Sequence, residues 1–212
     1  MDKIVYREVD KRDYGDLKKL INDAWHFEKY INKPKSVQHM LNANMRLALL
    51  SQNYTQVAEL NGEVVGYLYG RVDGKSIPLK NLVHIPHILY HGASLFFKSR
   101  HERNLIRGFL NMIKVYMKLL KNTKSNYDGE LVFFVVSSKC RGKGIGKKLL
   151  NNYLDYCRRH SVKNIYVYTD VNCNYGFYDF NGFTPRGTMP VSFDLYSGDF
   201  TFDVFIYDRN VS

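Results

Sequence analysis

Three glycines at alternate positions, set among basic side chains, mark the segment of this sequence that is best suited to bind an anion. They are Gly142, Gly144 and Gly146, and they follow an apolar run at residues 131–136. Glycine lets the backbone approach a ligand closely, and free N–H groups at a helix start attract anions. The cationic neighbours are Arg141, Lys143, Lys147 and Lys148. The pattern predicts a pyrophosphate cradle; the alternative is a tight strand-to-helix turn with solvated lysines.

Two common nucleotide-binding loops do not fit this segment. A P-loop requires Gly-x-x-x-x-Gly-Lys followed by Ser or Thr, and the segment does not have it. A dinucleotide-binding turn requires Gly-x-Gly-x-x-Gly, whereas here the third glycine comes one residue early. Both classes are therefore excluded for this loop.

A second block, at residues 174–183, reads Asn-Tyr-Gly-Phe-Tyr-Asp-Phe-Asn-Gly-Phe. The glycine loop resembles the coenzyme A loop of the GNAT superfamily of N-acetyltransferases, and the second block resembles that superfamily's Asn…Phe-Tyr-x-x-x-Gly-Phe block. One helix and one strand are predicted between the two blocks, as in the superfamily. The resemblance is strong over residues 130–183, fair for the N-terminal part, and fails over residues 74–127, which look like an insertion.

The resemblance implies acetyl-CoA as the acyl donor and assigns roles to particular residues. The Val136 N–H would polarise the thioester carbonyl, the loop would hold the pyrophosphate, and Tyr178 would protonate the leaving thiolate. Asn174 would contact the pantetheine arm or place a water. The implied cofactor-binding residues are Val135, Val136, Arg141, Gly142, Lys143, Gly144, Ile145, Gly146, Asn174 and Phe177.

An amine acceptor sets its own chemical requirement. An aliphatic amine has a pKa near 10.4, so it is mostly protonated at neutral pH and needs a base before it can attack. Glu130 is the first candidate for this base, and a water relay ending at Glu130 or Asp170 is equally consistent. Each assignment has a structural alternative: Tyr178 as a core residue, Glu130 as an exposed strand start, and Asn174 as a helix N-cap.

The elements around these residues predict an α/β fold. We expect a GNAT-like mixed, mostly antiparallel central sheet flanked by helices, with a helical insertion between the third and fourth strands. Asn61-Gly62 between two apolar runs predicts a β-hairpin. Predicted strands are residues 4–9, 54–60, 64–72, 131–136, 162–169, 191–196 and 200–208. Predicted helices are residues 17–25, 36–50, 103–121, 144–160 and 174–180.

The insertion carries a basic amphipathic helix. Its predicted apolar stripe is Ile106, Phe109, Leu110, Ile113, Met117 and Leu120. The basic residues beside the stripe are Arg103, Arg107, Lys114, Lys118 and Lys121. We interpret them as a solvated face, with a lid over an anionic group, or contact with acidic lipid or nucleic acid, as alternatives.

Three histidines, His84, His87 and His91, precede this helix. A metal site is conceivable, but Pro86 is expected to interrupt a helix there, and no cysteine or carboxylate lies near. Packing, or lining of an acceptor pocket, is the preferred interpretation.

Composition limits the remaining possibilities. The 212 residues, 45% of them hydrophobic, suit a single domain spanning residues 1–212. No transmembrane span or secretory signal is expected, and three cysteines without metal or disulfide spacing favour the reducing cytoplasm. The formal charge of +11 favours anionic partners. Nucleic acid is not the partner we expect, because the sequence has no recognised nucleic-acid motif.

These observations predict an N-acetyltransferase. The expected reaction is direct attack of a primary amine on acetyl-CoA in a ternary complex, without metal or covalent enzyme intermediate. Cys140 lies in the phosphate loop and Cys173 has no evident histidine partner, so neither suggests a nucleophile. The alternatives are a non-catalytic acyl-CoA-binding protein, a hydroxyl acceptor, and a basic adaptor for polyanions.

Overall fold

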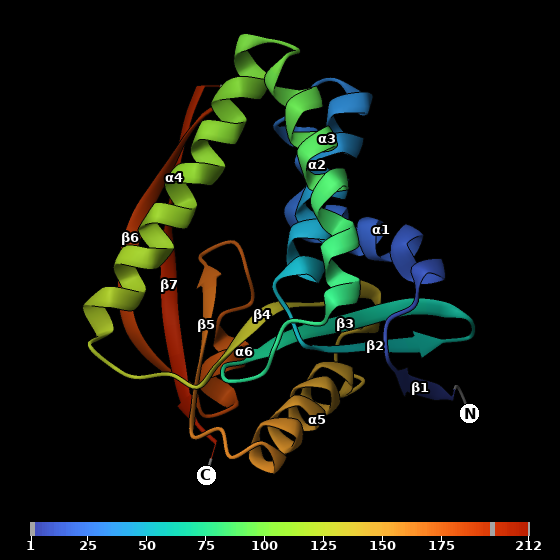
Figure 1. Ribbon diagram of the computed structural model, residues 1–212, viewed down its shortest axis with the longest axis vertical. Coiled ribbons are helices and arrows are strands. Elements are labelled where there is room, and N and C mark those ends of the chain that lie inside the picture. Colours follow the sequence, from blue (N-terminus) through green and yellow to red (C-terminus); the bar gives the residue numbers. More distant parts are fainter. Residues whose placement is uncertain (1–2, 196–197, 212) are drawn as a thin grey trace.

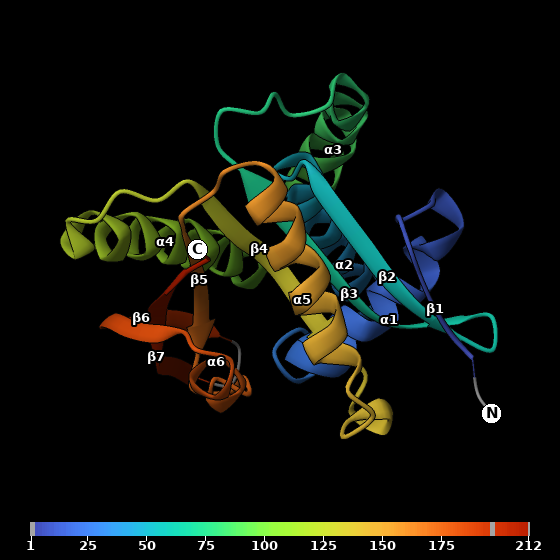
Figure 2. The same ribbon diagram turned by 90° about the horizontal axis from the view of Figure 1, so that it is seen from below.

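A single seven-stranded sheet with helices on both faces forms the body of the protein (Figures 1 and 2). The computed structural model describes residues 3–195 and 198–211. The strands are β1 (Ile4–Arg7), β2 (Tyr54–Leu60), β3 (Glu63–Val72), β4 (Gly129–Val136), β5 (Asn164–Asp170), β6 (Thr184–Leu195) and β7 (Gly198–Asn210). Their order is β1-β2-β3-β4-β5-β7-β6, and all neighbours are antiparallel except β4 and β5. The mixed, mostly antiparallel sheet confirms the predicted fold class.

The helices divide between the two faces of the sheet. They are α1 (Tyr14–Trp25), α2 (Pro34–Leu50), α3 (His84–Phe96), α4 (Arg100–Thr123), α5 (Ile145–Arg159) and α6 (Gly176–Phe180). One apolar core joins α1, α2 and α4 to one face, and the other joins α5 and α6 to the opposite face. In Figure 2, α5 lies on the near side of the sheet and α1 and α2 lie behind it. The two faces of the sheet are therefore covered by differently built layers.

The β2–β3 connection confirms the predicted hairpin. Asn61 and Gly62 both take positive φ angles, 52° and 84°, as a two-residue type I′ turn requires. The β2–β3 register runs from Tyr54 opposite Gly70 to Leu60 opposite Glu63.

The segment between β3 and β4 is helical, but one of its helices was not expected. The structure has α3 over the histidine segment, and Pro86 lies in the first turn of that helix. The expectation that Pro86 interrupts a helix was wrong, because a first-turn N–H has no partner within the helix and its loss costs nothing. The His84 Nδ1 atom lies 3.1 Å from a guanidinium nitrogen of Arg46. The Nδ1 atoms of His91 and His39 lie 2.9 Å apart. Among the described residues, no three His, Cys, Asp or Glu side chains are grouped to hold a metal.

The long insertion helix α4 packs its apolar face on β6 with half of the stripe expected from the sequence, because Ile106, Phe109 and Leu120 pack against the core. The predicted stripe members Leu110, Ile113 and Met117 are exposed, whereas Leu105, Gly108 and Leu119 are buried. The buried face is offset by one residue, which turns the helix by about 100°. The cause is local: Gly108 lets the helix approach Phe193 of β6 so closely that a Cβ would lie 2.3 Å from that ring.

At the C-terminal end of the chain, the first strand of the hairpin is longer than predicted, and the predicted end of α6 is confirmed. β6 begins at Thr184, well before the predicted start at residue 191. Tyr196 and Ser197, at the expected turn, lie outside the described residues. α6 ends at Phe180 with Asn181 as its C-cap, and Gly182 follows with a φ of 73°, the left-handed position expected after a helix end.

Candidate active site

β4 and β5 run side by side for a short distance and then separate (Figure 1). Their parallel pairing joins Gly129 to Ile165 and Glu130 to Tyr166, yet β4 continues to Val136. Val132 is an extra residue in the β3–β4 register, and such a bulge bends its strand. β5 pairs along its other edge with β7 instead. The sheet is therefore open between the C-terminal ends of β4 and β5.

The free edge of β4 presents backbone groups to this opening. The Ser137 N–H donates to the Val65 carbonyl at 2.8 Å and so points toward β3. Successive N–H groups of a strand point to opposite edges, so the Val136 N–H faces the β5 side. The same alternation turns the backbone groups of Val135 toward β3, which leaves only its side chain for a ligand.

The loop after β4 has the backbone shape of an anion cradle. Gly142 and Gly144 have φ angles of 78° and 73°, with nothing within 4 Å of the space where a Cβ would lie. α5 begins at Ile145 with no side-chain cap, and its first intrahelical bond joins the Lys148 N–H to the Gly144 carbonyl at 3.0 Å. The earlier N–H groups of the first turn point outward. Of the side chains around them, Arg141, Lys143, Lys147 and Lys148 are exposed.

Two phenylalanines pack beside the start of α5. The rings of Phe134 on β4 and Phe177 on α6 lie 5.3 Å apart. A Cβ on Gly146 would lie 3.3 Å from Phe134 and 3.4 Å from Phe177. Gly146 therefore allows α6 to pack against the helix start, and Phe177 becomes a wall of the opening.

Tyr178 is a buried phenol on the α5 face. Only 7% of it is exposed, and its ring contacts Phe177, Phe183 and Tyr207. Burial raises the pKa of Tyr178 well above its usual value, and nearby Cys173 and Asp170 raise it further. The hydroxyl therefore lies protonated inside the apolar layer, and the raised pKa makes it a weaker acid than a free phenol.

Glu130 lies on the other face, in a polar cluster. Its carboxylate pairs with Arg71 at 3.0 Å and accepts from the Tyr166 hydroxyl at 3.1 Å. Its side chain is only 15% exposed, so it is not an exposed strand start. Burial raises the pKa of Glu130, although Arg71 and Tyr166 both oppose that rise. Glu130 is therefore a partly desolvated carboxylate that is paired with Arg71.

Asn174 and Asp170 lie at the end of β5. Asn174 is exposed, and α6 begins after Tyr175 without a side-chain cap bond, so Asn174 does not act as an N-cap. Asp170 accepts from the Asn172 N–H at 2.8 Å and from the Cys173 thiol at 3.5 Å. Its carboxylate therefore holds the turn in which Asn174 lies.

Three residues of this region were missed from the sequence: Arg71, Tyr166 and Tyr116. Arg71 stands opposite Glu130 in the β3–β4 register, which a correct strand alignment could have revealed. Tyr116 of α4 stacks on Tyr168 of β5, with ring centres 4.2 Å apart, and the Tyr168 hydroxyl donates to the Tyr116 carbonyl at 2.8 Å. No sequence signal linked the insertion to β5.

The candidate acid and base lie on opposite faces of the opening. Tyr166, which binds Glu130, belongs to the core under α1, α2 and α4, whereas Tyr178 belongs to the core under α5. Asp170, near Tyr178, follows Tyr166 by four residues on β5, or about 13 Å. Glu130 and Tyr178 are thus held by different layers of the protein.

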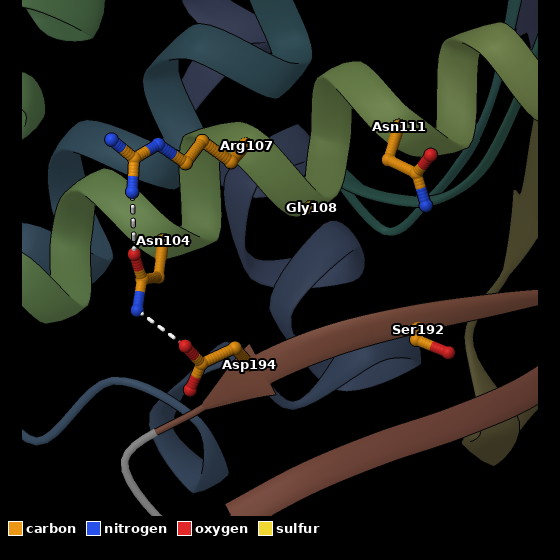
Figure 3. A pocket seen from close by; sticks show the side chains of 6 residues that line it. All are labelled: Asn104, Arg107, Gly108, Asn111, Ser192 and Asp194. Atoms are coloured by element: carbon orange, nitrogen blue, oxygen red, sulfur yellow. Dashed lines mark hydrogen bonds between the residues drawn. The ribbon is translucent and has the colours of Figure 1, made fainter.

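A separate polar cavity of about 280 Å³ lies between α4 and β6 (Figure 3). The Asn104 amide donates to Asp194 at 2.6 Å, and Arg107 donates to Asn104 at 3.3 Å. Its lining residues are Asn104, Arg107, Gly108, Asn111, Ser192 and Asp194. None of the candidate site residues lines it, so it is not part of the opening between β4 and β5.

Fold and loop together define an α/β protein whose sheet opens beside a basic, glycine-rich loop at a helix N-terminus. The acetyltransferase (GNAT) family model matches residues 17–183. The chain therefore belongs to the acetyltransferase (GNAT) family.

Solved structures of low sequence identity share the fold. An N-acetyltransferase from Staphylococcus aureus Mu50 is 17% identical, with 99% of each chain covered and a TM-score of 0.55. The ribosomal-protein-S18-alanine N-acetyltransferase from Escherichia coli is 10% identical, with 99% of this chain and 95% of that chain covered and a TM-score of 0.55. The structure of yncA from Salmonella typhimurium, with its cofactor acetyl-CoA, is 18% identical, with 99% and 95% covered and a TM-score of 0.54. No curated protein matches the sequence.

Proposed function

We propose that this protein transfers an acetyl group from acetyl-CoA to a primary amine by direct attack in a ternary complex. The observation that carries the proposal is the opening between β4 and β5 beside the cradle at the start of α5. An extended arm fits between separated strands, and a pyrophosphate fits the outward N–H groups and cations of the loop. Family membership supports the same donor.

The cofactor roles follow from these positions. The loop from Arg141 to Gly146 would hold the pyrophosphate, with Lys143 adding charge. The Val136 N–H, which faces the opening, would donate to the thioester oxygen as negative charge develops on it. Phe177 and the exposed Asn174 would flank the pantetheine arm.

The chemistry needs two protons removed from an ammonium acceptor and one supplied to the leaving thiolate. The ammonium first loses a proton to Glu130. The neutral nitrogen then attacks the carbonyl carbon, the carbon–sulfur bond breaks, and the nitrogen releases its second proton to solvent. Because Glu130 and Tyr178 lie on opposite faces, we propose that a water carries the first proton to Glu130. Tyr178 would protonate the departing thiolate.

A covalent enzyme intermediate is disfavoured by the state of the nearest thiol. Burial raises the pKa of the Cys173 thiol to about 12, and the neighbouring Asp170 adds to the rise. Only a thiolate is a strong nucleophile. Direct attack is therefore the simpler route.

A non-catalytic acyl-CoA-binding protein is the second candidate. Two observations favour it: Glu130 is already paired with Arg71, and Tyr178 is packed among aromatic rings. Acetyl-CoA binding is common to both candidates, so turnover distinguishes them.

Calorimetry with acetyl-CoA at moderate salt tests the proposal, with Gly144→Glu as the variant and Gly74→Glu as its control. Both glycines have positive φ angles and open space around them, 73° and 78°, so both substitutions carry similar backbone strain. Only Gly144→Glu puts a carboxylate into the cradle. We expect the native chain and Gly74→Glu to bind and Gly144→Glu to lose binding. If the native chain does not bind acetyl-CoA, the transferase proposal is rejected, and a polyanion-binding adaptor becomes the preferred function.

A further inference from the structure

An exposed apolar ridge runs along α3 and the short 3₁₀ helix before it, Leu79–Val83. Leu82, Ile85, Leu89 and Phe96 repeat at helical spacing, and they are 49, 39, 67 and 47% exposed. The opposite face, with His84 and Leu95, is buried against the body. Further large apolar side chains are exposed beside the ridge: Leu79, Val83, Tyr90 and Phe97. An apolar row of this kind on an outer helix marks an interaction surface.

The segment that carries the ridge has charged side chains of one sign only. Residues 74–101 contain no Asp or Glu, and they carry Lys75, Lys80, Lys98 and Arg100. The nearest carboxylate along the chain, Glu102, is buried and bound to Lys33 and Ser36. Lys80 pairs with Glu8 at 3.3 Å, and Lys75 lies 2.8 Å from the His160 ring. Lys98 and Arg100, which follow the end of α3, therefore carry the positive charge beside the ridge.

Exposed apolar side chains and positive charge occur together at the C-terminal end of α3. Phe97, at 80% exposure, stands at the α3–α4 connection, at the top of Figure 1. Beside Lys98 lies a hollow of about 610 Å³, lined by Lys33, Pro34, Lys35 and Lys98. An aromatic tip next to three lysines matches a surface that combines hydrocarbon with negative charge.

A second copy of the chain fits this ridge poorly. A helix of 13 residues is about 20 Å long, and a ridge about 10 Å wide would bury about 200 Å². A stable dimer needs roughly 800 Å² from each partner. A twofold contact would also bring together the basic residues that flank α3 in each copy, such as Lys98 and Arg100.

A bilayer removes both difficulties. α3 stands out from the body as a convex ridge (Figure 2), and a fluid membrane needs no matching groove to bury it. A helix lying in the interface places its apolar face about 5–10 Å into the headgroup region, while nearby Lys and Arg attract anionic lipids. We propose that the α3 ridge and the adjoining lysines dock this protein on an anionic lipid surface. No helix among the described residues is long and apolar enough to span a membrane.

Vesicle co-sedimentation of the full chain tests this proposal. The probes are vesicles of phosphatidylcholine alone and vesicles with equal parts of phosphatidylglycerol. We expect binding to the second kind only, and weakening by salt. The double variant Leu89→Asp/Phe97→Asp changes two exposed side chains, so it should fold and yet lose roughly tenfold or more in binding. The control, Val5→Asp, changes an exposed apolar residue on β1, a strand that pairs with β2, and should bind like the native chain.

Several outcomes would overturn the proposal. They are no native binding to anionic vesicles, equal binding to neutral vesicles, or native-like binding by the double variant. Sedimentation that shows a dimer dissociated by the double variant, without vesicle binding, would assign the ridge to a second copy instead. Acetyl-CoA calorimetry on the double variant checks that the fold is intact and is independent of the lipid result.

Discussion

Two candidate catalytic side chains occupy contrasting surroundings. Tyr178 is enclosed by aromatic rings that keep its phenol neutral, whereas Glu130 is held by a cation and a hydroxyl. A neutral phenol suits a proton donor and a carboxylate suits an acceptor. The proposed division of roles follows from this contrast.

Replacing Tyr178 by Phe tests the acid role. The ring would stay packed, so we expect unchanged unfolding but a loss of roughly 100-fold in kcat. Thiol release with saturating acetyl-CoA measures it. The control is Tyr175→Phe, a partly exposed neighbour that lacks the aromatic enclosure. Unchanged turnover in Tyr178→Phe would remove the acid role and return Tyr178 to the core.

Replacing Glu130 by Gln tests the base role through pH. The pKa of Glu130 is raised above 4.5, so the carboxylate form is lost as pH falls through that raised value, and native kcat/KM should fall with it. We expect Glu130→Gln to lower kcat/KM by roughly 100-fold and to remove this acid limb. Asp73→Asn is the control, because Asp73 binds the same Arg71 at 3.2 Å from an exposed position. An acid limb that persists in Glu130→Gln would disprove the assignment.

At the scale of the elements, α4 shows what determines which face of a helix is buried. Its exposed Leu110, Ile113 and Met117 are as apolar as its buried residues, so composition alone centred the stripe in the wrong place. The short distance to Phe193 at Gly108 set the orientation instead. A glycine within an amphipathic helix was the available signal of close approach.

Substituting Gly108 by Ala tests that contact. Ala favours helix, yet the new Cβ would lie 2.3 Å from the Phe193 ring, so we expect a loss of about 1–3 kcal/mol in unfolding free energy. Gly92→Ala in α3 is the control, because nothing lies within 4 Å of its Cβ position. That change should stabilise by about 0.5–1 kcal/mol. Urea unfolding measures both, and a more stable Gly108→Ala would contradict the contact.

Over the whole molecule, the candidate groups are divided between the two faces of the sheet. The cradle and Tyr178 lie with α5, while Glu130 lies under the layer that includes the insertion helix α4. The donor and the acceptor would thus approach the opening from different sides, which suits a ternary complex. The ridge on α3 lies away from both, so docking on lipid would leave the opening accessible.

The sequence alone determined those features that depend on local chemistry. The Asn61-Gly62 hairpin, the glycine loop, the start of α5 and the helix end at Gly182 all follow from backbone preferences of a few adjacent residues. The two motif blocks also sufficed for the fold class, because their order along the chain implied the strands between them.

Only the tertiary structure decided what depends on distant pairing. The separation of β4 from β5, the Arg71 partner of Glu130 and the burial of Tyr178 each require knowledge of which strands are neighbours. The orientation of α4 and the exposed face of α3 depend on contacts made far along the chain. Hydrophobic burial is non-directional, so apolar spacing indicates that a face exists, whereas packing decides which face is covered.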